Sequence, residues 1–223
     1  EKVAVVGNPI RDTILNNNVS AEKAKQYFKF LSDKPVVLFL GGSQGSQRIN
    51  DLVLDCLEEL IKNDVQVLHQ TGPKNFKEIF LEAKVILEFL PELYQNFYQA
   101  RDFFHEPEYL NALAAADLIV ARAGSGVIFE IAASKKPAIL IPLPEAAHNH
   151  QYLNAVEYAR FGGAIVIEEK NATVNLLARN ILDILDNPIK MNNMINGAKL
   201  FIKQDAAEII AKEILNVLDL NFE

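Results

Sequence analysis

Two glycine-rich segments have the composition of anion-binding loops. The segment GGSQGS at residues 41–46 follows the apolar run Val36–Leu40, and AGSG at residues 123–126 follows the run Leu118–Ala121. Each leads into a stretch with helical spacing, and the start of a helix offers free N–H groups and partial positive charge to a phosphate. Glycine pairs also occur in tight turns that need a positive φ. Two such loops in one sheet favour a diphosphate ligand over two unrelated turns.

Neither loop fits the other common nucleotide-binding motifs. No Gly-Lys-Ser/Thr follows residues 41–46, which excludes a Walker loop. A dinucleotide-binding domain needs an acidic residue at the end of its second strand to hold the ribose, and His69 and Gln70 occupy that position. The sequence therefore argues against a dinucleotide-dependent oxidoreductase.

Two charged residues accompany these loops. Glu130 stands one turn into the helix after residues 123–126, where it could accept hydrogen bonds from the vicinal hydroxyls of a sugar. The alternative is a solvated carboxylate favoured by the helix dipole. Arg11, in the segment GNPIR at residues 7–11, could bind a diphosphate bidentately or be an exposed surface arginine.

A third loop, LPEAAHNHQ at residues 143–151, contains Glu145, His148 and His150. Their closeness within one loop is weak support for a metal site. Amides and imidazoles at the edge of a crevice more naturally form hydrogen bonds with sugar hydroxyls. We therefore expect no metal and no cofactor.

The elements that position these loops alternate along the chain. Short runs of Val, Ile and Leu, suited to strands buried on both faces, alternate with amphipathic segments. The predicted strands are Val3–Val6, Val36–Leu40, Val65–Leu68, Val85–Glu88, Leu118–Ala121, Ala138–Ile141 and Ala164–Ile167. This order predicts an α/β fold: a Rossmann-like parallel sheet with helices on both faces, followed from Thr173 by a helical C-terminal tail. We expect the irregular segment Leu90–Glu108 to be an insertion on the rim of the sheet.

Composition excludes several classes of protein. Lys+Arg 22 against Asp+Glu 29 gives a net charge of −7, which argues against a nucleic-acid partner. The single cysteine, Cys56, has helical spacing with Leu52 and Leu60 and is expected in the core. No apolar run approaches the ~18 residues that cross a bilayer, and no signal peptide is recognisable, which predicts a cytoplasmic protein. Because VAVV begins almost at Glu1, either the numbering starts inside a longer chain or the protein has been cut, and a missing partner domain has to be considered.

Four segments together resemble the MurG family of GT-B glycosyltransferases. They are VGNPIR at residues 6–11, GGSQGSQRIN at 41–50, HQTG at 69–72, and ADLIVARAGSGVIFEIAASKKPAILIPLPEAAHNHQYLNA at 116–155. The resemblance implies that residues 1–223 form the carboxyl-terminal half of the GT-B fold, which binds the donor UDP-N-acetylglucosamine. The family's amino-terminal half, with the acceptor and membrane-facing sites and the proposed catalytic base, is not in this sequence.

The resemblance also implies roles for individual residues. Positions near the nucleotide diphosphate are matched by Arg11, Ser43 and Gln44, and the helix start that receives a phosphate by the backbone of Ser125, Gly126 and Val127. Glu130 matches the ribose-binding glutamate, and Gln151 and Asn154 match positions that hold the donor sugar. Where the family often has threonine this chain has Val127, so Ser125 is expected to supply the hydroxyl. The segment Phe103–Pro107 aligns poorly with the family's uracil-pairing main chain.

The function that the resemblance implies is an inverting, metal-independent transfer of N-acetylglucosamine from UDP-N-acetylglucosamine to lipid I. The product would be lipid II, made for peptidoglycan by a protein peripheral on the cytoplasmic face of the inner membrane. Lipid I and the membrane would be contacted only by the full-length protein. A second hypothesis is a non-catalytic nucleotide-sugar-binding subunit that pairs with a separate acceptor-binding protein. The two differ in whether one reading frame encodes both halves.

Overall fold

A computed structural model describes residues 6–144, 149–203 and 205–217 of the chain. In this part of the chain six strands form one parallel sheet in the order β3-β2-β1-β4-β5-β6. The strands are β1 (Val36–Leu40), β2 (Gln66–Gln70), β3 (Tyr98–Arg101), β4 (Leu118–Ala121), β5 (Ala138–Leu140) and β6 (Ala164–Val166). The predicted fold class is confirmed. Because all pairs are parallel, the carboxyl ends of the strands lie along one edge of the sheet.

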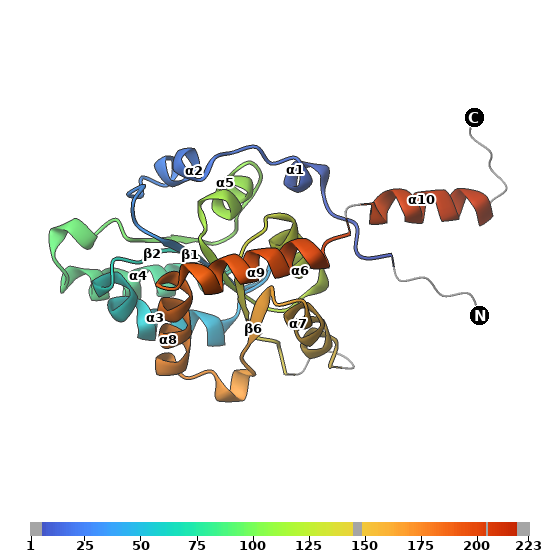
Figure 1. The fold of residues 1–223 in the computed structure, drawn as a ribbon. Helices are drawn as coiled ribbons and strands as arrows, with labels where there is room; N and C mark the ends of the chain where they lie inside the picture. The colour runs from blue at the N-terminus through green and yellow to red at the C-terminus, as the bar shows by residue number, and fades with distance from the viewer. Residues whose placement is uncertain (1–5, 145–148, 204, 218–223) are drawn as a thin grey trace.

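Helices cover both faces of the sheet (Figure 1). They are α1 (Asp12–Leu15), α2 (Ala21–Tyr27), α3 (Gln47–Lys62), α4 (Phe76–Glu88), α5 (Glu108–Ala115), α6 (Ser125–Ala133), α7 (His150–Arg160), α8 (Val174–Leu185), α9 (Pro188–Phe201) and α10 (Ala206–Val217), with 3₁₀ turns η1 (Glu92–Tyr94) and η3 (Glu169–Asn171). The helices α8, α9 and α10 confirm the predicted helical tail. The described residues include no helix with both the length and the apolar character needed to cross a membrane.

The alternation of side chains along each strand divides the core into two layers. Val37 and Phe39 of β1 pack in one cluster with α3, α4 and α8, whereas Leu38 and Leu40 pack in the other with α2, α5 and α6. Figure 1 shows α3 and α8 on one side of the sheet and α2 and α5 on the other, with α10 projecting away from these layers. Cys56 lies in the first cluster, as expected.

Most predicted strands are confirmed within one or two residues, and two predictions were wrong. Val85–Glu88 is the last part of α4, because Ile79, Ala83 and Leu87 recur at helical spacing and are buried on one face. The segment Leu90–Glu108 is not an insertion: it supplies the edge strand β3, whose residues alternate between buried and half-buried. Of the predicted strand Val3–Val6 only Val6 is described, and it lies outside any strand.

A close approach of two backbones fixes the loop after β1 against the loop after β2. Gly45 has a φ of +77°, and a Cβ atom there would lie 2.0 Å from the carbonyl oxygen of Thr71. Gly72 has a φ of +86°, and a Cβ atom there would lie 2.2 Å from the carbonyl oxygen of Gln44. Both positions therefore require glycine, and the turn interpretation of the first glycine loop holds for Gly45.

A series of buried hydrogen bonds stabilises the contact between these two loops. Asn50 donates from Nδ2 to the carbonyl of Thr71 at 3.0 Å and offers its Oδ1 to Nε2 of His69 at 3.0 Å. The other ring nitrogen, Nδ1, lies 3.0 Å from the hydroxyl of Tyr98. Burial lowers the pKa of His69 to about 3, so the neutral imidazole donates from Nε2 and accepts at Nδ1. His69 of the HQTG segment is thus a structural residue that joins α3, β2 and β3.

The glycine contact predicts different effects of alanine at two glycines. Gly45→Ala should lower the free energy of unfolding by at least ~2 kcal/mol, because it adds left-handed strain to a backbone overlap. Gly126→Ala should change stability by less than ~1 kcal/mol, because Gly126 lies in the first turn of α6 and no atom lies within 4 Å of the place that a Cβ would take. Urea unfolding of both variants measures this. Equal destabilisation would contradict the close approach of the two loops.

Candidate functional site

The loops at the carboxyl edge of the sheet meet around a buried arginine. Arg122, directly after β4, donates from Nη1 to the carbonyls of Ile141 and Pro142 at 3.1 and 3.3 Å. Its Nη2 donates to Oγ of Ser46 at 2.7 Å and forms an ion pair with Glu169 of η3. The side chain is 9% exposed. One guanidinium therefore holds the loops after β1, β4, β5 and β6 together.

Two contiguous cavities open along this edge. The first, here called the Glu130 cavity, has a volume of about 320 Å³. Its walls are Arg11, Leu40, Gly42, Ser43, Gln70, Phe103, Phe104, His105, Glu106, Tyr109, Val127 and Glu130. The second, here called the glycine cavity, has a volume of about 400 Å³. Its walls are Gly41, Gly42, Gly45, Ser46, Gln47, Arg48, Arg122, Gly124, Val127, Leu143 and Gln151. Gly42 and Val127 line both cavities, so one elongated ligand could occupy the two.

The start of α6 presents free backbone donors near the boundary of the two cavities. The N-cap residue is Gly124, which has no side chain that could cap the helix. The first intrahelical bond runs from the N–H of Ile128 to the carbonyl of Gly124 at 3.1 Å. The N–H groups of Ser125, Gly126 and Val127 therefore have no acceptor within the helix. The start of α3 differs, because Oγ of Ser46 caps it. The start of α6 therefore offers an anion one more backbone N–H than the start of α3.

A carboxylate with two hydrogen-bond donors forms one wall of the Glu130 cavity. Oε1 of Glu130 accepts from Nη2 of Arg11 at 2.9 Å, and Oε2 accepts from the hydroxyl of Tyr109 at 2.8 Å. Arg11 also donates from Nη1 to Glu106 at 2.6 Å. The guanidinium predicted to face a diphosphate is thus paired here with two carboxylates, and its contact with phosphate stays a prediction.

Gln70 connects the walls of the Glu130 cavity. Its Nε2 donates to the carbonyl of Gly42 at 3.0 Å, and its Oε1 accepts from the N–H of Phe104 at 3.1 Å. The main chain of residues 103–106 is thereby held beside the first glycine loop. The sequence alone predicted no role for Gln70, although it lies within the HQTG segment.

The predicted sugar-side residues lie further along the edge. Oε1 of Gln151 accepts from the N–H groups of Ala123 and Leu143 at 3.2 and 3.1 Å, which leaves the amide nitrogen as the group available to donate to a ligand. Asn154 donates from Nδ2 to the carbonyl of Ala123 at 3.3 Å.

The structure distributes the predicted site residues unevenly. It brings Arg11, Ser43, Val127 and Glu130 to the Glu130 cavity and Gln151 to the glycine cavity. Ser125 and Asn154 instead line a separate hollow of about 260 Å³ beside Phe129 and Phe201. Gln44 and Gly126 line neither cavity.

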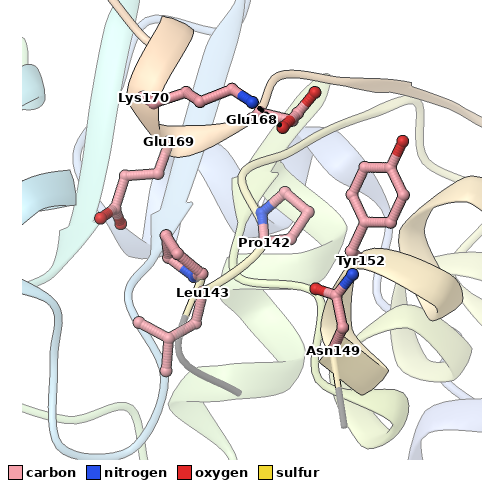
Figure 2. A pocket seen from close by; sticks show the side chains of 8 residues that line it. Pro142, Leu143, Asn149, Tyr152, Glu168, Glu169 and Lys170 are labelled. Atoms are coloured by element: carbon pink, nitrogen blue, oxygen red, sulfur yellow. Dashed lines mark ion pairs between the residues drawn. The ribbon is translucent and has the colours of Figure 1, made fainter. Parts of the chain in front are cut away.

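A further hollow of about 300 Å³ adjoins the glycine cavity at Leu143 (Figure 2). It lies between the loop after β5 and η3, with Asn149 and Tyr152 on one side and the ion pair of Glu168 with Lys170, at 3.0 Å, on the other. This pair compensates its own charge, and Glu169, which pairs with Arg122, adds a second carboxylate, so the hollow offers a ligand no net positive charge. It therefore fits a diphosphate less well than the start of α6.

Of the three residues of the third loop that could bind a metal, the structure describes only His150. Glu145 and His148 lie outside the described residues, and His150 begins α7. Within the residues that are described, no group of three His, Cys, Asp or Glu side chains could hold a metal ion. The absence of a metal thus stays a prediction.

Comparison with known proteins relates this chain to one family of glycosyltransferases. Residues 36–211 match the model of the glycosyltransferase family 28 C-terminal domain. A relative from Thermoanaerobacter sp. (strain X514), named UDP-N-acetylglucosamine–N-acetylmuramyl-(pentapeptide) pyrophosphoryl-undecaprenol N-acetylglucosamine transferase, is 36% identical over 217 residues, which are 97% of this chain and 57% of the relative. A relative of the same name from Anaeromyxobacter dehalogenans (strain 2CP-C) is 35% identical over 94% of this chain and 51% of its own length.

Solved structures share the fold at lower identity. MurG of Acinetobacter baumannii superposes with a TM-score of 0.72 at 23% identity, over 93% of this chain and 59% of that one. The S. aureus MnaA–UDP complex has a TM-score of 0.69 at 14% identity, over 98% of this chain and 55% of that one. This chain thus spans little more than half the length of the proteins that it matches. Family model and relatives agree with the resemblance seen in the sequence, and the chain belongs to the glycosyltransferase family 28 C-terminal domain family.

Proposed function

We propose that this chain is the donor-binding half of an inverting glycosyltransferase that moves N-acetylglucosamine from UDP-N-acetylglucosamine to lipid I in peptidoglycan synthesis. The observation that carries the proposal is the pair of contiguous cavities, with an oriented carboxylate in one and the uncapped start of α6 at their boundary. The names of the relatives at 35–36% identity support the same reaction and the same donor. The UDP bound to the structural neighbour MnaA supports a nucleotide site on this fold.

We infer which group of the site receives each part of the donor. The ribose hydroxyls donate to the carboxylate of Glu130, and the base lies along the main chain of residues 103–106 that Gln70 holds in place. The diphosphate lies against the N–H groups of Ser125, Gly126 and Val127, with the Ser43 hydroxyl beside it. The sugar continues into the glycine cavity towards the amide of Gln151.

The chemical role of this half is to stabilise the leaving group. In an inverting transfer an acceptor hydroxyl attacks the anomeric carbon from the face opposite the diphosphate, the bond from that carbon to the phosphate oxygen breaks, and the negative charge on UDP increases. Backbone N–H groups fixed at the start of α6 meet that charge without reorganisation, which is an electrostatic contribution of the oxyanion-hole type. The base that takes the acceptor proton and the contacts with lipid I and the membrane belong to the full-length protein, at the cytoplasmic face.

The alternative of a non-catalytic nucleotide-sugar-binding subunit is less well supported. The relatives that match nearly the whole chain are longer single chains, and each is named as a transferase. If this chain worked as a subunit with a separate acceptor-binding protein, we would expect relatives of similar length rather than longer transferases.

The first prediction is that the 223-residue chain binds UDP without a divalent ion. Calorimetry should give the same affinity with EDTA as without it, because backbone donors rather than a metal meet the phosphates. Lys170 lines the hollow of Figure 2 and neither of the two cavities, so Lys170→Ala serves as the control and should leave the affinity unchanged. Absence of binding at millimolar UDP, or a tenfold loss with EDTA that magnesium restores, would contradict the proposal.

The second prediction concerns the ribose contact. Glu130→Ala should weaken UDP binding by about 10-fold, the lower end of what a charge-assisted hydrogen bond contributes, because removing a carboxylate near a diphosphate also relieves repulsion. The same change should leave the affinity for 2′,3′-dideoxy-UDP equal or slightly tighter, because this ligand has no ribose hydroxyls to lose and keeps the diphosphate whose repulsion is relieved. Glu58→Ala, in an exposed pair with Lys62 on α3, is the control. An equal loss for both ligands would show that Glu130 does not contact the ribose hydroxyls.

A further inference from the structure

Glu130 accepts hydrogen bonds from one charged side chain, Arg11, and from one uncharged side chain, Tyr109. Tyr109 lies in the first turn of α5. It is 8% exposed and packs in the core cluster that contains Leu38 and Leu40. Packing explains the ring, but it does not explain the hydroxyl, which donates to Oε2 of Glu130 at 2.8 Å at the wall of the Glu130 cavity.

The ring of Tyr109 also supports the second donor to the same carboxylate. The guanidinium carbon of Arg11 lies 5.3 Å from the centre of this ring, within the range of a cation–π contact. Arg11 then reaches Oε1 of Glu130 at 2.9 Å and is held from its other side by Glu106 at 2.6 Å. Oγ1 of Thr13 donates to the same oxygen of Glu106 at 3.1 Å.

Two donors on different oxygens restrict the rotation of a carboxylate. A glutamate side chain has three rotatable bonds, and a single contact with Arg11 would still allow the group to pivot about that contact. With Tyr109 on the second oxygen, both oxygens are fixed, and each retains a lone pair that can accept from a ligand. Glu130 is 18% exposed at its side chain, so this remaining capacity is directed to the cavity rather than to bulk solvent.

Tyr109 is a donor that stays uncharged beside the ion pairs of Arg11. Glu130 and Glu106 carry two negative charges and Arg11 one positive charge. Tyr109 adds a hydrogen bond without adding charge. Burial, reinforced by the negative charge of Glu130, raises the pKa of Tyr109 well above its usual value, so the phenol stays protonated and remains a donor.

We propose that Tyr109 is a positioning residue for the ribose contact: its hydroxyl and ring, together with Arg11, hold the carboxylate of Glu130 in the orientation that accepts the two ribose hydroxyls. This inference rests on the proposed function. It assigns Tyr109 no contact with the nucleotide and no part in the transfer.

The test is the variant Tyr109→Phe, which removes one oxygen atom and keeps the ring under Arg11. UDP affinity should fall by about 3- to 10-fold, because a carboxylate that is free to pivot has to be immobilised when the ribose binds. Affinity for 2′,3′-dideoxy-UDP should not change, because that ligand makes no use of the orientation of Glu130. The matched control is Tyr94→Phe. The hydroxyl of Tyr94 lies 3.5 Å from Asp64, and Tyr94 lines neither cavity, so this variant should bind both ligands as the parent chain does.

Two other outcomes would overturn the inference, and each is distinct from a failure of the proposed function. If Tyr109→Phe weakens both ligands equally, the residue acts through general stability, which thermal unfolding of the variant would show independently. If Tyr109→Phe changes neither affinity while Glu130→Ala still weakens UDP alone, Glu130 needs no positioning by Tyr109. The proposed ribose site itself would be contradicted by a parent chain that fails to bind UDP, or by a Glu130→Ala variant that leaves UDP affinity unchanged or weakens both ligands equally.

Discussion

The guanidinium of Arg122 lies at the point where the loops after four strands of the sheet converge. A buried charge is strongly unfavourable unless it is paired and hydrogen-bonded, and Arg122 meets this requirement with two backbone carbonyls, Ser46 and Glu169. These partners come from three different loops, so displacing any one of the loops would remove a partner of the buried charge. The positions of the first glycine loop and the loop before α7 are therefore linked through one side chain. The cavities depend on that link, because both loops form walls of the glycine cavity.

Around this fixed edge, the fold separates two kinds of recognition. The glycine loops and the start of α6 present backbone groups, which can meet phosphate charge with little dependence on side-chain conformation. The Glu130 cavity instead uses side chains that constrain one another: Gln70 fixes the main chain of residues 103–106, and Arg11 and Tyr109 fix Glu130. A nucleoside diphosphate sugar has a matching division between its phosphates and its hydroxyl-bearing nucleoside. This correspondence connects the parallel sheet to the proposed donor site.

The sequence predicted the fold where local pattern and tertiary environment agree. The central strands β1 and β4 are continuous runs of apolar residues buried on both faces, and their bounds follow directly from the sequence. The edge strand β3 escaped prediction because the segment YQAR has only two buried positions and pairs on one side only. Val85–Glu88 has the apolar composition of a buried strand, but the helical spacing of Ile79, Ala83 and Leu87 buries one face of α4 and places the segment in that helix.

The site was predictable to the extent that its residues belong to recognisable segments. Glu130 and Arg11 were identified, but their mutual pairing was not, because 119 positions separate them in the sequence. Tyr109, Gln70 and Arg122 act through contacts with distant segments, so no local pattern marks them. The measurement that tests the account most directly is a crystal structure of the chain with UDP. We expect the ribose hydroxyls within ~3.2 Å of the Glu130 carboxylate and the phosphates at the N–H groups that begin α6. UDP bound in the hollow of Figure 2, or bound with its phosphates away from α6, would contradict it.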